Sequence, residues 1–416
     1  MSQSVDSLCA TQRSVRQRSS CKSRETGWHA TRLLPMLRNH LSEEAAAAWT
    51  PPDKPGAGGH RGRYLWTDAF GLINFITLSK ETASPVYLTL AKRLAVTAHD
   101  VLGRTLDGTA RLPRATDAEP LKGGLRIGKF EAHGSDGDGQ YHHYLTLWMF
   151  ALNRVALSSG DKKYNQLAVQ LAKAVHPHFV LRKGAGGLRM VWKVSTDMEN
   201  VLVPSEGHLD AATGFVVYRL LQGTAEHLHG PPGVLNNEIA DYRQLISREG
   251  KMRTSSDPLD LGMGLWMCHF LDEDWARVLD IQSLEVARII LDEKHGLMAR
   301  EPARRLAFRE FRACLGLECF GIDDELTARV AAVIDFWQKY LYGSAEEDLR
   351  PISLVMYASA LIPGAFRDGY VGGIHDYSAT RNAARMKYWT NEANHTVDRT
   401  ITISFQLIKP LSNDPK

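Results

Sequence analysis

Segments of helical length alternate along the chain between two hydrophobic patterns. In the first, apolar residues cover nearly every face, as at 64–78, which is too long for an ordinary strand. In the second, apolar residues recur at helical spacing on one face, as at 86–102 after Pro85. Mostly apolar helices are predicted over 64–78, 140–158, 209–221, 259–271, 308–319 and 352–361. Amphipathic partners are predicted over 86–102, 164–180, 236–248, 275–291, 324–342 and 378–388.

This alternation indicates two layers of helices. A helix that is apolar on most faces must be surrounded, whereas an amphipathic helix lies on the outside. Six buried helices inside six amphipathic ones predict an all-α fold, an (α/α)6 barrel in which the inner helices follow one another at about 57 residues. Short strands are expected only over 188–194 and 400–407.

The first forty residues differ from the rest in charge and composition. They hold seven basic residues against two acids, a balance of +5, which leaves −2 of the total +3 for the remaining chain. Few apolar residues and many Ser, Gln and Arg predict a disordered tail over 1–40, or alternatively a targeting presequence. We expect a single toroid domain over 41–416. Its near-neutral charge argues against nucleic acid as a partner.

Composition sets further limits on the class of protein. The chain is 44% hydrophobic and 23% charged, as in ordinary globular proteins, and no apolar run reaches the length of a membrane span. Together with the lack of a secretory pattern, this predicts a cytoplasmic protein without a membrane partner. The five cysteines form no CxxC pair, which is typical of a reducing compartment. Cys268 and His269 with a later cysteine could bind zinc, but burial as a small apolar residue is the simpler reading, and we predict no metal or cofactor.

Polar residues concentrate just before the second inner helix, in the loop FEAHGSDGDGQYHHY at 130–144. Loops entering parallel inner helices meet at one end of such a barrel, so these residues predict a site there. Acids, an amide and an aromatic side chain suit a sugar-processing site, although Asp138 could instead cap the helix. His142 and His143 point about 100° apart, so one of them is expected to face the axis. The candidates from this loop are Asp136 and Asp138 for catalysis, and Gln140, Tyr141 and His142 for substrate binding.

A second group precedes the third inner helix in VPSEGHLD at 203–210. Glu206 and His208 form a candidate acid–base pair, because His titrates near neutrality and burial raises the pKa of a carboxyl. Asp210 falls in the first turn and could be a cap.

The first and fifth inner helices add candidate binding residues. Asp68 lies beside Trp66 in an apolar helix, where a carboxyl needs a partner or a function. Arg309, Glu310 and Arg312 could hold a substrate carboxylate or phosphate, or form salt bridges between helices. We select Trp66, Asp68 and Arg309 as substrate-binding candidates.

The hairpin count and the two segments SDGDGQY and EGH resemble the six-hairpin glycosidase superfamily, and in architecture the N-acylglucosamine 2-epimerase group. The resemblance implies a carbohydrate-active enzyme with a small-molecule or oligosaccharide substrate. Glycoside hydrolysis would use Asp136 or Asp138 with Glu206, supported by His208 and Asp68. Epimerisation by His and Glu, a non-catalytic binding scaffold and isoprenoid cyclisation remain as alternatives. The oligomeric state stays open.

Overall fold

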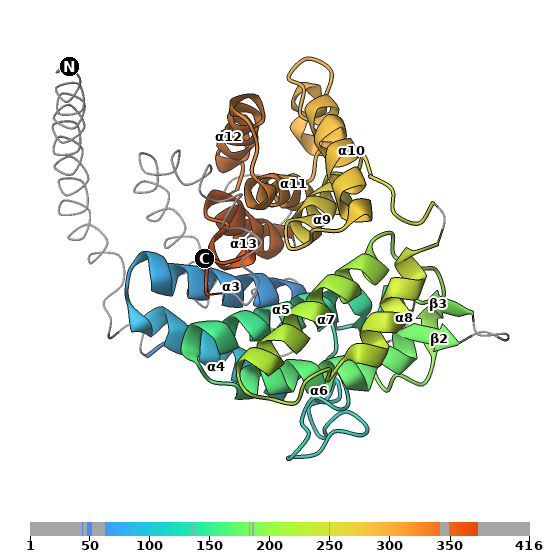
Figure 1. Cartoon of the computed structure of the whole chain (residues 1–416). Helices are drawn as coiled ribbons and strands as arrows, with labels where there is room; N and C mark the ends of the chain where they lie inside the picture. Colours follow the sequence, from blue (N-terminus) through green and yellow to red (C-terminus); the bar gives the residue numbers. More distant parts are fainter. Residues whose placement is uncertain are drawn as a thin grey trace, which may run out of the picture.

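The computed structural model describes residues 44, 48–51 and 63–372, apart from 133, 135, 183, 185–186, 249 and 342–348. Within this part the chain is mainly helical (Figure 1). The α-helices are α3 (Leu65–Glu81), α4 (Pro85–Leu102), α5 (His142–Ser159), α6 (Lys163–Phe179), α7 (Asp210–His227), α8 (Asn236–Ile246), α9 (Pro258–Cys268), α10 (Asp274–Ile290), α11 (Ala307–Phe320), α12 (Asp324–Gln338) and α13 (Arg350–Leu361).

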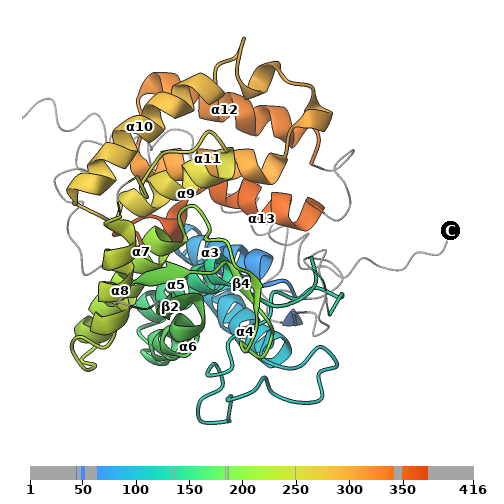
Figure 2. The ribbon, with the colours of Figure 1, turned by 90° about the vertical axis from the view of Figure 1, so that its right-hand side faces the viewer.

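The helices form hairpins whose first members close into a ring. Each of α3, α5, α7, α9 and α11 packs against the helix that follows it in the chain, its outer partner. The first members also contact each other in order, and α13 returns to α3 (Figure 2). We call α3, α5, α7, α9, α11 and α13 the inner ring. Its closure confirms the predicted (α/α)6 arrangement for six inner and five outer helices.

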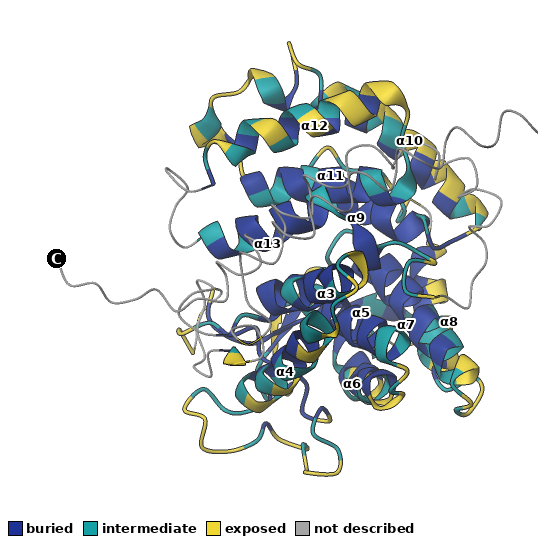
Figure 3. Cartoon of the chain, turned by 90° about the vertical axis from the view of Figure 1, so that its left-hand side faces the viewer, coloured by how far each residue is buried: buried dark blue, intermediate teal, exposed yellow. Residues whose placement is uncertain are grey.

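Burial separates the two layers as the hydrophobic pattern predicted (Figure 3). On α5 every residue from Leu145 to Ala156 is buried. On α10 only one stripe is buried, made by Ala276, Leu279, Asp280, Ser283 and Ala287. Such spacing places these five residues on one side of the helix, which faces α9. The outer helices thus shield the apolar inner ring from water.

The backbones of α9 and α11 approach each other closely. A Cβ added to Gly262 would lie 2.0 Å from the carbonyl oxygen of Arg312, and one added to Gly316 would lie 2.2 Å from that of Gly262. Only glycine allows this approach, because any larger residue would have to displace backbone. These two glycines therefore set the spacing of the two helices.

The axis of the inner ring is filled by a group of aromatic side chains, which we call the axial aromatic cluster: Phe70, Phe150, Trp266 and Phe366. Phe366 belongs to the 3-10 helix η6 (Gly364–Phe366), which directly follows α13 in the fold. Its ring centroid lies 5.1 Å from that of Phe70 and 6.0 Å from that of Phe150. The backbone oxygen of Phe366 accepts a hydrogen bond from the Trp266 indole at 3.1 Å. Contacts between α3, α5 and α9, which are not all neighbours in the ring, show that these side chains point to its axis.

Among the described residues, the strands are short and lie in the loops between helices. β1 (Gln140–Tyr141), β4 (Lys193–Val194) and β5 (Val201–Val203) form one antiparallel sheet. β2 (Val180–Arg182) and β3 (Leu188–Met190) form another. The predicted strand over 188–194 is thus split between two sheets, because Val191 and Trp192 link β3 to β4.

Some predictions fall outside the described residues. These are the tail over 1–40, the sixth outer helix over 378–388 and the strand over 400–407. The domain boundary at 41 stays a prediction. Across the part of the chain that the structure describes, no helix is both long and apolar enough to cross a membrane.

Candidate functional site

All six inner helices begin at the same end of the ring, which we call its entry end. Side chains in the first two turns of neighbouring helices contact each other there. The ring centroids of Trp66 on α3 and His143 on α5 lie 5.6 Å apart. The indole N–H of Trp66 donates a hydrogen bond to the sulfur of Met356 on α13. The Thr213 hydroxyl of α7 lies 3.5 Å from the sulfur of Met263 on α9. Six helix N-termini thus bring loops and unpaired N–H groups together, as predicted.

His143 occupies the axis-facing side of α5 at this end. It precedes Phe150 by seven residues, two helical turns, and so shares the face that carries the axial aromatic cluster. The Trp192 indole donates a hydrogen bond to Nδ1 of His143 at 3.0 Å. Because an indole only donates, Nδ1 is the acceptor and the proton of the neutral imidazole sits on Nε2. Burial lowers the pKa of His143 to about 3, so the ring is neutral at pH 7 with Nε2–H as a donor.

Aromatic side chains surround His143. The rings of Tyr141 and Trp192 lie 5.3 Å apart, and the ring of His143 stacks on that of Trp192 at 5.8 Å. The hydroxyls of Tyr64 and Tyr144 form a hydrogen bond of 2.6 Å. Trp192 is 37% exposed. Such flat apolar faces beside hydroxyl groups are suited to the faces and edges of a sugar ring.

Asp210, the first residue of α7, is buried where α7 meets the loop that precedes it. Gly214, four residues on and so on nearly the same side of α7, lies against the Tyr242 ring of the outer helix α8. Its carboxyl lies beneath Gly207, where an added Cβ would be 2.4 Å from Oδ2. Among the described residues Oδ2 has no hydrogen-bond partner. Burial, opposed by Lys251 and reinforced by Glu206 and Asp260, raises the pKa of Asp210 to about 7.

Glu206 and His208, both predicted catalytic residues, lie in the loop above Asp210. Lys251 is 3.0 Å and Arg248 3.7 Å from the Glu206 carboxylate. Nε2 of His208 lies 2.7 Å from the backbone oxygen of Arg253. The structure therefore brings Glu206, His208 and Asp210 together, at the junction between loop and helix.

The entry to α9 and α11 extends this group. Asp257 caps α9 by accepting hydrogen bonds from the backbone N–H groups of Leu259 and Asp260. It also forms an ion pair with Arg309, the predicted substrate-binding residue of α11. Burial and the nearby Asp257 raise the pKa of Asp260, while His208 and Arg309 oppose the rise. Arg309 therefore links the starts of two inner helices.

The 130–144 loop differs from the prediction. Asp138 is buried and accepts hydrogen bonds from the Gly128 N–H at 3.1 Å and from the Arg126 guanidinium, which itself donates to the Arg104 carbonyl at 2.6 Å. Gln140 is buried too, donating to the carbonyls of Gly123 and Thr196. Asp138 is thus not the cap of α5, and both side chains are engaged in hydrogen bonds within the loop. Both hold the loop in place, through partners that a local pattern does not indicate.

Replacing Asp138 with Ala should therefore affect stability first. The change leaves the buried Arg126 guanidinium without its carboxylate, which typically costs about 3–5 kcal/mol. We expect a clearly lower denaturant midpoint. Asp136→Ala is the matched control, because that side chain is exposed, and it should leave the midpoint within about 0.5 kcal/mol. Equal stability of both variants would contradict the anchoring role of Asp138.

The remaining candidates of this region lie away from the axis. Asp136 is exposed and paired with Lys129, and this hydrogen bond lowers the pKa of Asp136, so it is a poor proton donor. His142 points to the outer layer, where Nε2 lies 2.7 Å from the Tyr242 hydroxyl. Asp68 sits two residues before the axis-facing Phe70, on the opposite side of α3, and pairs with Arg63 at 3.4 Å. These placements do not support the roles predicted for the three residues.

The candidate zinc ligands do not assemble either. In the described ranges no three or more His, Cys, Asp and Glu side chains gather as a metal site requires. Burial, with Asp280 nearby, raises the pKa of the Cys268 thiol well above its usual value, so this cysteine stays protonated.

Three polar residues of the inner helices were not selected from the sequence: His143, Asp210 and Arg312. The 100° step between His142 and His143 indicated that only one faces the axis, but not which one. Likewise the sequence left open which of Arg309, Glu310 and Arg312 form salt bridges. The structure pairs Arg309 with Asp257 and Glu310 with Arg305, and it turns Arg312 toward the axis.

Comparison with known proteins gives one similar fold to report. Cellobiose 2-epimerase from Spirochaeta thermophila DSM 6192 matches with a TM-score of 0.46 and 13% sequence identity, over 97% of this chain and 100% of that one. No protein-family model matches the sequence, and no curated protein does. The assignment of a six-hairpin architecture therefore rests on the helix contacts described above.

Proposed function

We propose that this chain is a carbohydrate-active enzyme that transfers protons at the entry end of the inner ring. The observation that carries the proposal is Asp210, a carboxyl buried beneath Gly207 at the entry end of α7, whose pKa burial raises to about 7. A carboxyl that titrates near neutrality can both give and take a proton, whereas a binding scaffold has no need of one. The neutral His143 on the next helix and the aromatic side chains around it supply a hydrogen-bond donor and a stacking surface.

Hydrolysis of a glycosidic bond is the reaction that we place first. It needs a protonated acid for the leaving oxygen and a carboxylate that activates water or attacks the sugar carbon. Asp210 carries the proton below about pH 7, and Glu206 is a carboxylate ion-paired to Lys251. Two carboxyls in opposite protonation states are the usual arrangement for such acid–base pairs. In this scheme Glu206 and Asp210 replace the pair predicted from the sequence.

Epimerisation is the second candidate, and His143 favours it. There, Asp210 in its ionised form would remove the proton beside a sugar carbonyl. The Nε2–H of His143 would stabilise the negative charge that develops on the carbonyl oxygen. A proton from solvent water, delivered to the opposite face while Asp210 releases the first proton to solvent, gives a product of unchanged mass.

Product analysis separates these reactions. The protein would be incubated in D2O with disaccharides and monosaccharides, and the products followed by mass spectrometry and NMR. Hydrolysis splits the disaccharide with uptake of water, whereas epimerisation gives an isomer that carries deuterium at one carbon. If neither occurs with any sugar of a broad panel, while the protein remains folded, the proposed function is wrong.

The pH dependence should follow the protonation of Asp210. For hydrolysis the active form is the protonated acid, so kcat/KM should fall as the pH rises through about 7. For epimerisation the active form is the carboxylate, and kcat/KM should rise over the same range. Initial rates between pH 5 and 9 would show the direction. A rate that is flat across pH 7 would exclude Asp210 as the group that transfers the proton.

A further inference from the structure

Lys251 joins two loops at the entry end of the inner ring. It belongs to the connection from α8 to α9, and its Nζ is 3.0 Å from Oε1 of Glu206 in the loop before α7. The same connection contacts that loop twice more. Arg248 lies 3.7 Å from Oε2 of Glu206, and Nε2 of His208 lies 2.7 Å from the backbone oxygen of Arg253. Lys251 is therefore held against the loop that carries Glu206.

A tight turn brings Glu206 close to Asp210. The backbone N–H of Asp210 donates a hydrogen bond to the carbonyl of Gly207 at 3.4 Å, so the two acids flank one turn at the start of α7. Oε1 of Glu206 and Oδ2 of Asp210 are both buried, and neither accepts a hydrogen bond from a described residue. Two carboxylates placed together in this way repel each other, and a nearby cation reduces the repulsion. The ammonium of Lys251 supplies that cation.

Charged and titratable groups reach Asp210 from several elements. Burial is the main cause of its raised pKa, and Glu206 from its own loop and Asp260 from α9 raise this pKa further. Tyr242 of α8 lies near as a neutral phenol, because burial raises its pKa well above the usual value. Lys251 is the basic group of this set, and it lowers the pKa of Asp210. Since the Lys251 side chain is only 16% exposed, solvent screens this attraction weakly.

We propose that Lys251 is a positioning residue of the carboxyl pair, whose ammonium fixes the Glu206 carboxylate and weakens the hold of Asp210 on its proton. The inference rests on the proposed function, since it concerns the proton that the same site transfers. Without Lys251, burial and the two neighbouring acids would together hold this proton to a higher pH. With Lys251 in place, Asp210 exchanges its proton near neutral pH, where a general acid or base is most effective.

The pH profile of turnover by the full-length protein tests this role, with the sugar that the product analysis finds active. Lys251→Met removes the ammonium but keeps an apolar stem of similar length. We expect the midpoint of kcat/KM against pH to move upward by about 0.5 unit or more, whether the reaction is hydrolysis or epimerisation. Lys251→Arg keeps the positive charge and should restore the midpoint of the wild type. A purely structural side chain would change the rate or the stability without moving the midpoint.

A second measurement needs no turnover. Asp210→Asn removes the titrating carboxyl, so the gain in free energy of unfolding over the parent protein reports the proton that Asp210 holds. In the wild-type background this gain should grow above about pH 4 and level off above about pH 7. In the Lys251→Met background it should continue to grow above pH 7, because Asp210 keeps its proton to a higher pH there. Chemical denaturation of the four proteins between pH 4 and 9 gives both curves.

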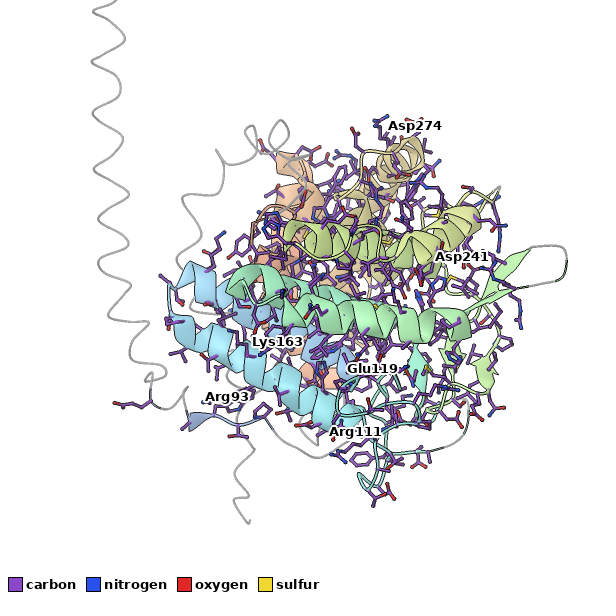
Figure 4. The ribbon with its side chains drawn as sticks, turned by 60° about the horizontal axis from the view of Figure 1, so that its bottom comes forward. Arg93, Arg111, Glu119, Lys163, Asp241 and Asp274 are labelled. Carbon is purple, nitrogen blue, oxygen red and sulfur yellow. The ribbon has the colours of Figure 1, made fainter. Side chains whose placement is uncertain are left out.

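Two control variants make the result specific. Arg248→Gln removes the other cation beside Glu206, which is not among the groups that shift the pKa of Asp210, and should move the midpoint less than Lys251→Met does. Lys163→Met removes a lysine of the outer helix α6, labelled in Figure 4, that pairs with Asp161 at 3.1 Å. This variant should have the activity and the midpoint of the wild type. If Lys251→Met fails to fold, Lys251→Gln replaces it as a neutral and polar variant.

The outcomes separate this inference from the proposed function. Turnover with the same midpoint in wild type and Lys251→Met would leave the proposed function standing and overturn the role of Lys251. An equal shift in Arg248→Gln would also overturn it, because any cation beside Glu206 would then serve. A stability difference that extends above pH 7 in Lys251→Met, without turnover of any sugar, would support the effect of Lys251 on Asp210 and remove the proposed function.

Discussion

Asp210→Asn should abolish turnover while making the protein more stable at alkaline pH. The amide cannot transfer a proton, so we expect kcat/KM to fall by about 100-fold or more. Stability follows from the raised pKa: the folded state holds the Asp210 proton up to about pH 7, while the unfolded chain releases it near 3.8. The contribution of this carboxyl to stability is therefore full below about pH 4 and is lost as the pH rises to 7.

The measurement is a pair of thermal unfolding curves for wild type and variant, at pH 4 and pH 8. The variant should exceed the wild type by between about 1 and 4 kcal/mol at pH 8 and match it at pH 4. Asp274→Asn on the surface of α10 is the control, with activity and stability unchanged. Lower stability of Asp210→Asn at both pH values would show that Asp210 is a structural residue.

Gly262→Ala should destabilise the fold strongly. The new methyl group would lie 2.0 Å from the Arg312 backbone oxygen. This steric clash can be relieved only by moving α9 away from α11. Overpacking against a side chain costs about 1–3 kcal/mol, and a backbone cannot move aside as a side chain does. We expect a loss of about 3 kcal/mol or more, measured by chemical denaturation.

Gly264→Ala on the same helix is the matched control. An added Cβ there meets its nearest atoms at 3.7 to 4.0 Å, which is ordinary contact. Alanine also favours the helix over glycine by about 1 kcal/mol, so this variant should be as stable as the wild type or more so. If both substitutions had the same effect, the close approach of α9 and α11 would not be what Gly262 provides.

The helices of the inner ring could be predicted because their burial is visible in the pattern of apolar residues in the sequence. A helix such as α5, buried on all sides, must be apolar on all sides, whereas α10 shows its single buried stripe in the spacing of its apolar residues. The pairing of layers follows from this contrast. The predicted bounds agree with the structure to within a few residues, except at the end of α7, where a polar last turn concealed a helix that continues to His227.

The site could be predicted only in part. Which residues it contains follows from short segments of the sequence, whereas the directions in which their side chains point depend on the tertiary structure. The loop before α7 contains Glu206 and His208 at the expected place. In contrast, whether Asp138 is free depends on Arg126, which lies twelve residues earlier in the same connection between α4 and α5. Asp210 looked like a helix cap, and its importance arises from burial beneath Gly207, which no spacing in the sequence shows.

The helix η6 closes the base of the ring from the C-terminal side of α13. The backbone N–H of Ala365 donates to the Thr77 hydroxyl of α3 at 3.0 Å, so the first hairpin is completed by residues nearly three hundred positions later. During synthesis the earlier hairpins emerge from the ribosome well before this segment exists. The aromatic side chains at the axis therefore stay exposed to water until Phe366 has been synthesised. Exposed apolar surface is prone to aggregation, so we expect a protein shortened before η6 to aggregate.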